Sequence, residues 1–107
     1  MATDIPRGQV RGIDILEVTL SPATVATTTS AEQTFTVQGL LLHDWVYVNK
    51  PTNQAGLVIA NARVSAANTL AITFANVTSG TLTPTANEVY SVIRFRPVTL
   101  PVPSAIA

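Results

Sequence analysis

Hydrophobic and polar residues alternate in several short runs along this chain, and a two-residue period is typical of β-strands with one buried face. The strongest alternation falls at residues 33–38, 45–49, 57–65 and 69–75. Less regular runs predict further strands at 13–20, 23–29, 81–83 and 88–96. No segment of useful length has the 3.6-residue period of a helix. The pattern therefore predicts about six to eight short strands.

The segment 57–75 is the clearest predicted hairpin. Its two strands are joined by Ala66-Ala67-Asn68, and asparagine tolerates the positive φ that a tight turn requires. In the second strand Leu70, Ile72 and Phe74 share one face. In the first strand, strict alternation predicts one face made of Val58, Ala60, Ala62 and Val64 and another made of Leu57, Ile59, Asn61 and Arg63.

Two other strands raise the question of which face is buried. In 88–96 the pattern predicts that Val89, Ile93 and Phe95 point inward and that Glu88, Tyr90, Arg94 and Arg96 lie on the opposite face. In 45–49, Trp45 and Tyr47 share a face. We expect these two rings in the core, because the chain has few other large side chains. The alternative is that they are exposed interface anchors.

Turn signals separate the predicted strands about every 8 to 12 residues, which is typical of sandwiches, jelly rolls and small barrels. We expect an all-β fold: a single-domain antiparallel β-sandwich, jelly-roll-like, over residues 13–96. Residues 1–12 lack periodicity and predict an extended N-terminal arm. Residues 97–107 contain three prolines among apolar residues and predict an extended C-terminal tail. That tail either orders on a partner or folds back over its own domain.

Composition narrows the classes of partner. The chain has 107 residues, of which 47% are hydrophobic and 11% charged, against about 25% charged in typical domains. Its formal net charge is zero, so no basic field attracts nucleic acid or an anionic membrane. A neutral polar surface costs less to desolvate than a charged one. This favours a protein whose surface becomes buried in contacts with other proteins.

The sequence contains few residues that could form a catalytic or metal-binding site. The single histidine, His43, lies beside Asp44, whose side chain in a strand would point to the opposite face, so the pair is interpreted as a turn or strand entry. There is no cysteine, and the six carboxylates are scattered. No phosphate-binding glycine motif occurs. We therefore expect no enzyme activity, catalytic residue, cofactor, metal site or small-molecule substrate.

Candidate contact residues lie near the two ends of the chain. The arginines Arg7, Arg11, Arg94 and Arg96 are candidates for ion pairs with acidic residues of a partner. For Arg94 and Arg96 the alternative is a solvated outer face. The apolar tail residues that complete the candidate set are Val98, Leu100, Val102 and Ile106. Proline lowers the entropic cost of ordering such a tail on a partner.

Four strings in the chain resemble a module found among structural proteins of tailed-bacteriophage virions, including small head decoration or cement proteins. These strings are TFTVQGL, VYVNKP, QAGLVIANARVSAANTLAITFAN and TPTANEVY, within residues 29–96. The third, from Gln54 to Asn76, is the most specific. The two ends, 1–12 and 97–107, fall outside the resemblance.

The resemblance implies a β-sandwich or jelly-roll subunit that binds the outer capsid surface and clamps major capsid subunits together. It also implies self-association as a dimer or trimer, and synthesis in the cytoplasm of a host bacterium. No catalytic residues transfer. Because the module also occurs in other parts of virions, a tail or fibre component that binds host glycans is the alternative.

Overall fold

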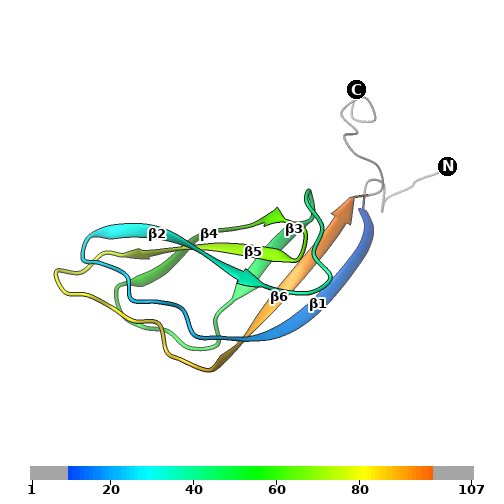
Figure 1. Cartoon of the computed structure of the whole chain (residues 1–107). Helices are drawn as coiled ribbons and strands as arrows, with labels where there is room; N and C mark the ends of the chain where they lie inside the picture. The colour runs from blue at the N-terminus through cyan, green and yellow to red at the C-terminus, as the bar shows by residue number, and fades with distance from the viewer. Residues whose placement is uncertain (1–9, 98–107) are drawn as a thin grey trace.

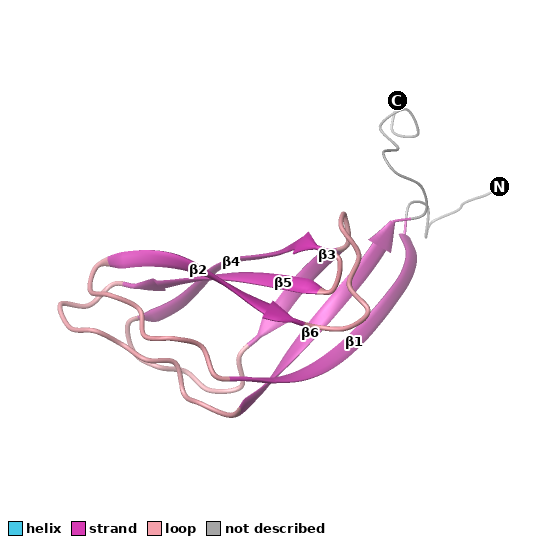
Figure 2. Ribbon diagram, viewed as in Figure 1, coloured by secondary structure: helices cyan, strands magenta, loops and turns pink. Residues whose placement is uncertain are grey.

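The computed structural model describes residues 10–97, which form six β-strands and no helix (Figures 1 and 2). The strands are β1 (Val10–Leu20), β2 (Thr29–Thr36), β3 (Trp45–Asn49), β4 (Leu57–Ala66), β5 (Thr69–Asn76) and β6 (Glu88–Pro97). They pair into two antiparallel three-stranded sheets with the orders β1-β6-β3 and β2-β5-β4. The all-β prediction is therefore confirmed for the described residues.

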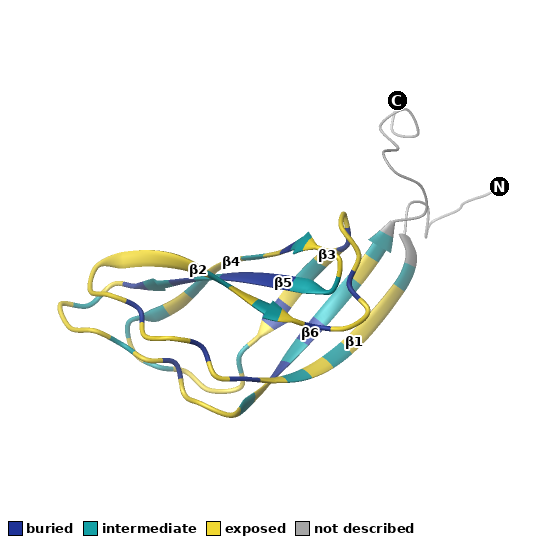
Figure 3. Ribbon diagram, in the orientation of Figure 1, coloured by how far each residue is buried: buried dark blue, intermediate teal, exposed yellow. Residues whose placement is uncertain are grey.

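The two sheets share one hydrophobic core, which gives the molecule a sandwich-like arrangement. One sheet contributes Leu20, Val48, Tyr90 and Val92, and the other contributes Val64, Leu70, Ile72 and Phe74. The central strand β5 is the most buried element (Figure 3). Removing this apolar surface from water is the main force that holds the sheets together. On one side, β3 also packs against β4.

The hairpin β4–β5 confirms the clearest prediction from the sequence. Ala67 and Asn68 link the two strands, and Asn68 has a φ of 57°. The side chains of Leu70, Ile72 and Phe74 are fully buried. The turn is tied to the chain that follows β2, because the Asn68 amide donates to the Leu40 carbonyl at 2.7 Å.

The strict alternation predicted for β4 is wrong. Its register with β5 shifts between Ile59 and Asn61, which is the mark of a β-bulge. The bulge returns Leu57 and Ile59 to the inner face together with Ala62 and Val64. Val58, which was predicted to lie with the last two, is 47% exposed. A one-residue shift in register exchanges the faces of a strand, and the sequence period alone does not reveal it.

The predicted inward face of β6 is also wrong. Tyr90 and Val92 are fully buried, whereas Val89 and Phe95 are exposed. Both faces of this strand carry large apolar residues, so alternation separates the faces without saying which one is inside. Arg94 and Arg96 lie on the same side as Tyr90 and Val92, and their charges are matched by carboxylates of the same chain.

The predicted strands 23–29 and 81–83 are reduced to one isolated bridge between Val25 and Leu82, apart from Thr29, which begins β2. The Asn76 side chain supports this crossing, since its buried amide donates to the carbonyls of Val25 at 3.1 Å and Gly80 at 2.8 Å. At the chain ends, residues 10–12 belong to β1 and Pro97 belongs to β6. The rest of both predicted arms lies outside the described residues.

Candidate protein-interaction surface

The outer face of the sheet β1-β6-β3 carries two rows of apolar side chains. Strand register places Ile13, Phe95 and Trp45 side by side in the first row. The second row is Ile15, Ile93 and Tyr47. Each row takes one residue from each strand, and successive rows are two residues apart, as expected for side chains on one face of a sheet. We call these six residues the apolar face.

The apolar face is open to solvent. Trp45 is 73% exposed, Ile15 69% and Phe95 37%. At about 200 Å² per large side chain, the exposed fractions of Ile13, Ile15, Trp45, Tyr47 and Phe95 amount to roughly 600 Å². That is at the upper end of the roughly 300–600 Å² found for the largest apolar patch on a monomer. The largest apolar patch of a monomer is often functional.

The surfaces that border the apolar face are polar, so the apolar face ends there. The next row along the same sheet is Glu17, Ser91 and Asn49. The outer face of the other sheet instead carries an ion pair across β5, in which Arg63 Nε donates to Glu32 Oε2 at 2.8 Å. The two outer surfaces of the molecule therefore differ in chemistry, and only one is suited to burial against another surface.

The prediction that Trp45 and Tyr47 belong to the core is wrong. The inward residues of β3 are Val46 and Val48, and the core is filled by Tyr90 and Phe74, which leaves both rings of β3 outside. The alternative considered from the sequence places both rings on the surface, and that is where the structure has them. Apolar residues on both faces of β3 and β6 were the signal that the outer face of this sheet is apolar as well.

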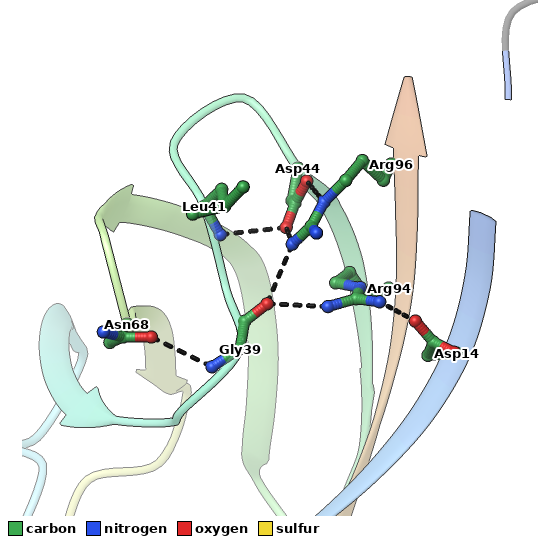
Figure 4. A network of polar contacts seen from close by, with 7 residues as sticks. All are labelled: Asp14, Gly39, Leu41, Asp44, Asn68, Arg94 and Arg96. Atoms are coloured by element: carbon green, nitrogen blue, oxygen red, sulfur yellow. Dashed lines mark hydrogen bonds and ion pairs between the residues drawn. The ribbon is translucent and has the colours of Figure 1, made fainter. Parts of the chain in front are cut away.

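Behind the apolar face, a polar network joins β1, β6 and the loop between β2 and β3 (Figure 4). Arg96 binds Asp44 through two hydrogen bonds, Nε to Oδ1 at 2.9 Å and Nη2 to Oδ2 at 2.8 Å. Asp44 also accepts a hydrogen bond from the Leu41 amide at 2.9 Å. The Gly39 carbonyl accepts from Arg94 at 2.6 Å and from Arg96 at 2.9 Å. Arg94 is further paired with Asp14 on β1.

The contacts within this network shift the pKa values of its charged side chains. Burial acts to raise the pKa of Asp44, but the hydrogen bonds from Arg96 and the Leu41 amide outweigh it, and the pKa lies below its ordinary value. The hydrogen bond to Asp44 raises the pKa of Arg96. Burial and the neighbouring charge of Arg96 lower the pKa of Arg94. Asp44 and Arg96 therefore form a charged pair at neutral pH.

The contact residues predicted from the sequence fall into two groups: some lie among the described residues and the others do not. Arg94 and Arg96 are engaged inside the chain, where they hold the loop between β2 and β3. Arg11 lies in β1, and its side chain is not described. The remaining candidates lie outside the described residues: Arg7, Val98, Leu100, Val102 and Ile106. His43 is exposed in a turn with a φ of 82°, and Asp44 after it is buried, as expected for a strand entry.

A second polar cluster lies near the start of β6. Lys50 Nζ pairs with Glu88 Oε1 at 3.0 Å and donates to the Thr52 carbonyl at 3.0 Å. An open groove of about 360 Å³ runs beside it, bordered by residues 50–54 with Leu57 and Ile59. The Lys50 ammonium is held by these internal contacts, which is the arrangement of a structural ion pair.

Residues 10–97 contain neither a cluster of metal-ligating side chains nor a membrane-spanning helix. No three side chains of His, Asp or Glu are grouped as metal ligands there. None of the described elements is a helix long and apolar enough to cross a membrane. Comparison with known proteins gave no matching family model, no match among curated proteins and no match among solved structures.

Proposed function

We propose that this protein is a non-enzymatic structural component of a tailed-bacteriophage virion, a cement or decoration protein that binds the outer head surface. In this proposal its partner is the major capsid protein, and it stabilises contacts between capsid subunits. The fold would be a jelly-roll-like β-sandwich with extended N- and C-terminal arms. The observation that carries the proposal is the apolar face, an uncharged surface of six side chains, five exposed and Ile93 partly buried, with two aromatic rings on its edge strand.

The size and chemistry of the apolar face suit a protein partner. Its area of roughly 600 Å² approaches the ~800 Å² that each partner contributes to a standard interface. Aromatic residues are enriched at the centres of interfaces, where charged residues are depleted. Burial of one such anchor typically contributes about 2 kcal/mol or more. The virion setting rests on the resemblance of residues 29–96 to phage structural proteins.

The proposal is tested by binding to purified phage heads that lack this protein. The variant Trp45→Ser removes an exposed ring from the apolar face, and we expect about 30-fold weaker binding, which corresponds to ~2 kcal/mol. Val58→Ser is the matched control, because it removes an exposed apolar side chain from the outer face of the other sheet. Equal head occupancy for wild type, Trp45→Ser and Val58→Ser would overturn the assignment of the apolar face.

Copy number distinguishes head from tail. Gel densitometry of purified virions is expected to give hundreds of copies for a head decoration protein, because a cement protein follows the repeating capsid lattice. A handful of copies per particle would contradict decoration and place the protein in the tail.

A second candidate, a tail or fibre module that binds host glycans, is favoured by one observation. Trp45 and Tyr47 stand two residues apart on the edge strand β3, both more than half exposed. Flat aromatic rings stack on the apolar faces of sugars. Since Trp45 is the sole tryptophan, its fluorescence reports on this position. A change in emission with host surface polysaccharide, and none with phage heads, would favour this candidate over decoration.

A further inference from the structure

Among residues 10–97, the outer edge of β1 is a second feature without a partner. β1 pairs with β6 along one side and is the outermost strand of its sheet (Figure 1). Within residues 10–97, no backbone hydrogen bond joins its other side to another element. In an edge strand, alternate residues point their N–H and C=O groups away from the ladder, ready to pair with another strand.

Between Ile13 and Leu20 this edge has few of the features that prevent pairing, and its charged residues there are Asp14 and Glu17. β1 has 11 residues, about twice the length of an average strand. Between Ile13 and Leu20 it contains no lysine, proline or glycine, and its register with β6 is regular from Gly12 onward. By contrast, the edge strand β4 carries two register shifts, and β3 has only five residues. Short length, bulges, proline and charged side chains, lysine above all, are the devices that normally protect an edge.

Apolar side chains flank the β1 edge on both faces. Ile13 and Ile15 are exposed on the outer side. On the inner side, Leu16 and Val18 pack against the core but remain partly exposed. An added strand would therefore bury apolar surface on both faces as well as pair the backbone. The edge of β2 differs, because its outer residues Ser30, Glu32 and Thr34 are polar and exposed.

We propose that a second copy of this chain pairs with β1 through its own β1, antiparallel, across a two-fold axis perpendicular to the sheet. The result is a six-stranded sheet with the order β3-β6-β1-β1-β6-β3. The two-fold axis keeps the outer faces on the same side, so the apolar faces of both copies become continuous. Because the pairing needs no capsid, it stands or falls separately from the proposed function.

Charge limits the register of the pairing. A two-fold axis at Asp14 or at Glu17 would place identical carboxylates directly opposite each other, which is destabilising. An axis at Ile15 or Leu16, near the middle of the strand, avoids both pairs. With the axis at Ile15, each Glu17 lies opposite Ile13 of the second copy. With the axis at Leu16, it lies opposite Ile15. In both registers the Ile15 side chains of the two copies are direct or diagonal neighbours.

Sedimentation and light scattering of the free protein test the pairing. We expect the wild type to be a dimer. Ile15→Glu should weaken dimerisation at least tenfold, because the new carboxylate opposes either its own copy or Glu17. Tyr47→Glu is the matched control, since Tyr47 lies on the same face but on the far strand β3, and it should leave the dimer intact. A monomeric wild type at its highest soluble concentration would overturn the proposal.

Cross-linking keeps the proposal testable if Ile15→Glu fails to fold, and the chain contains no native cysteine. Ile15→Cys should be cross-linked between copies by a short bismaleimide, because direct or diagonal neighbours lie within about 8 Å. Tyr47→Cys should not, because five strand spacings separate the two copies of Tyr47, roughly 24 Å. Equal cross-linking of both variants would indicate face-to-face stacking and would overturn the edge pairing.

Discussion

Asp44 and Arg96 are joined by two hydrogen bonds, at 2.9 and 2.8 Å, and this pair fixes the start of β3 against the end of β6. The residues next to them, Trp45 and Phe95, lie directly opposite each other in the strand register. Since adjacent residues of a strand face opposite sides, the polar pair lies inside and the two aromatic rings lie outside. The internal ion pair therefore positions one row of the apolar face.

Asp44→Ala is expected to lower the free energy of unfolding by about 3 kcal/mol, because Arg96 and the Leu41 amide lose a buried partner. Urea unfolding at neutral pH measures this change. Glu32→Ala is the matched control, since Glu32 forms an ion pair with Arg63 that is exposed to solvent, and its loss should be clearly smaller. Similar losses for the two variants would show that burial does not strengthen the Asp44–Arg96 pair.

Stability should fall in acid, and Asp44 should account for part of the fall. The pKa of Asp44 in the folded protein lies below its ordinary value, so the unfolded chain binds protons first as pH decreases. The stabilisation is present above the unfolded pKa of about 4 and is lost as pH falls through the folded pKa. Unfolding at pH 7 and near pH 3 is the measurement. Asp44→Asn should show a shallower loss, and an unchanged acid slope would contradict the assignment.

Gly56→Ala is expected to destabilise the protein by about 2 kcal/mol, because side chains at positive φ are strained. Gly56 has a φ of 83°, and an added Cβ would collide with the Thr78 side chain. Thermal unfolding measures the effect. Gly80→Ala is the control, since a Cβ added at Gly80 would meet no atom of a more distant residue within 4 Å, and its change should stay within about 0.5 kcal/mol. A neutral Gly56→Ala would mean that the loop at 54–56 relaxes freely.

Tyr90→Phe should leave stability unchanged or raise it by up to about 1 kcal/mol, because a buried hydroxyl without a partner carries a desolvation cost. Tyr90 is fully buried, and its hydroxyl has no hydrogen-bond partner among the described residues. Burial, with a contribution from the Glu88 charge, raises the pKa of Tyr90 to about 12. Tyr47→Phe, at an exposed ring, is the control and should be neutral. A loss above ~1 kcal/mol for Tyr90→Phe would reveal a partner for the hydroxyl.

Local chemistry explains which elements were predictable. The hairpin β4–β5 follows from two alternating runs and from Asn68, whose tolerance of positive φ is a property of the residue itself. The strand β3 has the predicted bounds, Trp45–Asn49, because proline at position 51 cannot donate to a ladder. The bulge in β4 was not predictable, because a shift in register depends on the strand it pairs with.

The sequence by itself determined that the chain is built from strands, where the main hairpin turns, and that its surface carries little charge. Only the tertiary structure decided which face of each strand is buried. Trp45, Tyr47 and Phe95 have the same alternation whether they point inward or outward, and the choice depends on how the two sheets fill the space between them. Tyr90 and Phe74 fill that space, and Arg96 can lie inside because Asp44, distant in sequence, neutralises it. The apolar face is therefore a consequence of packing between sheets, which no single strand encodes.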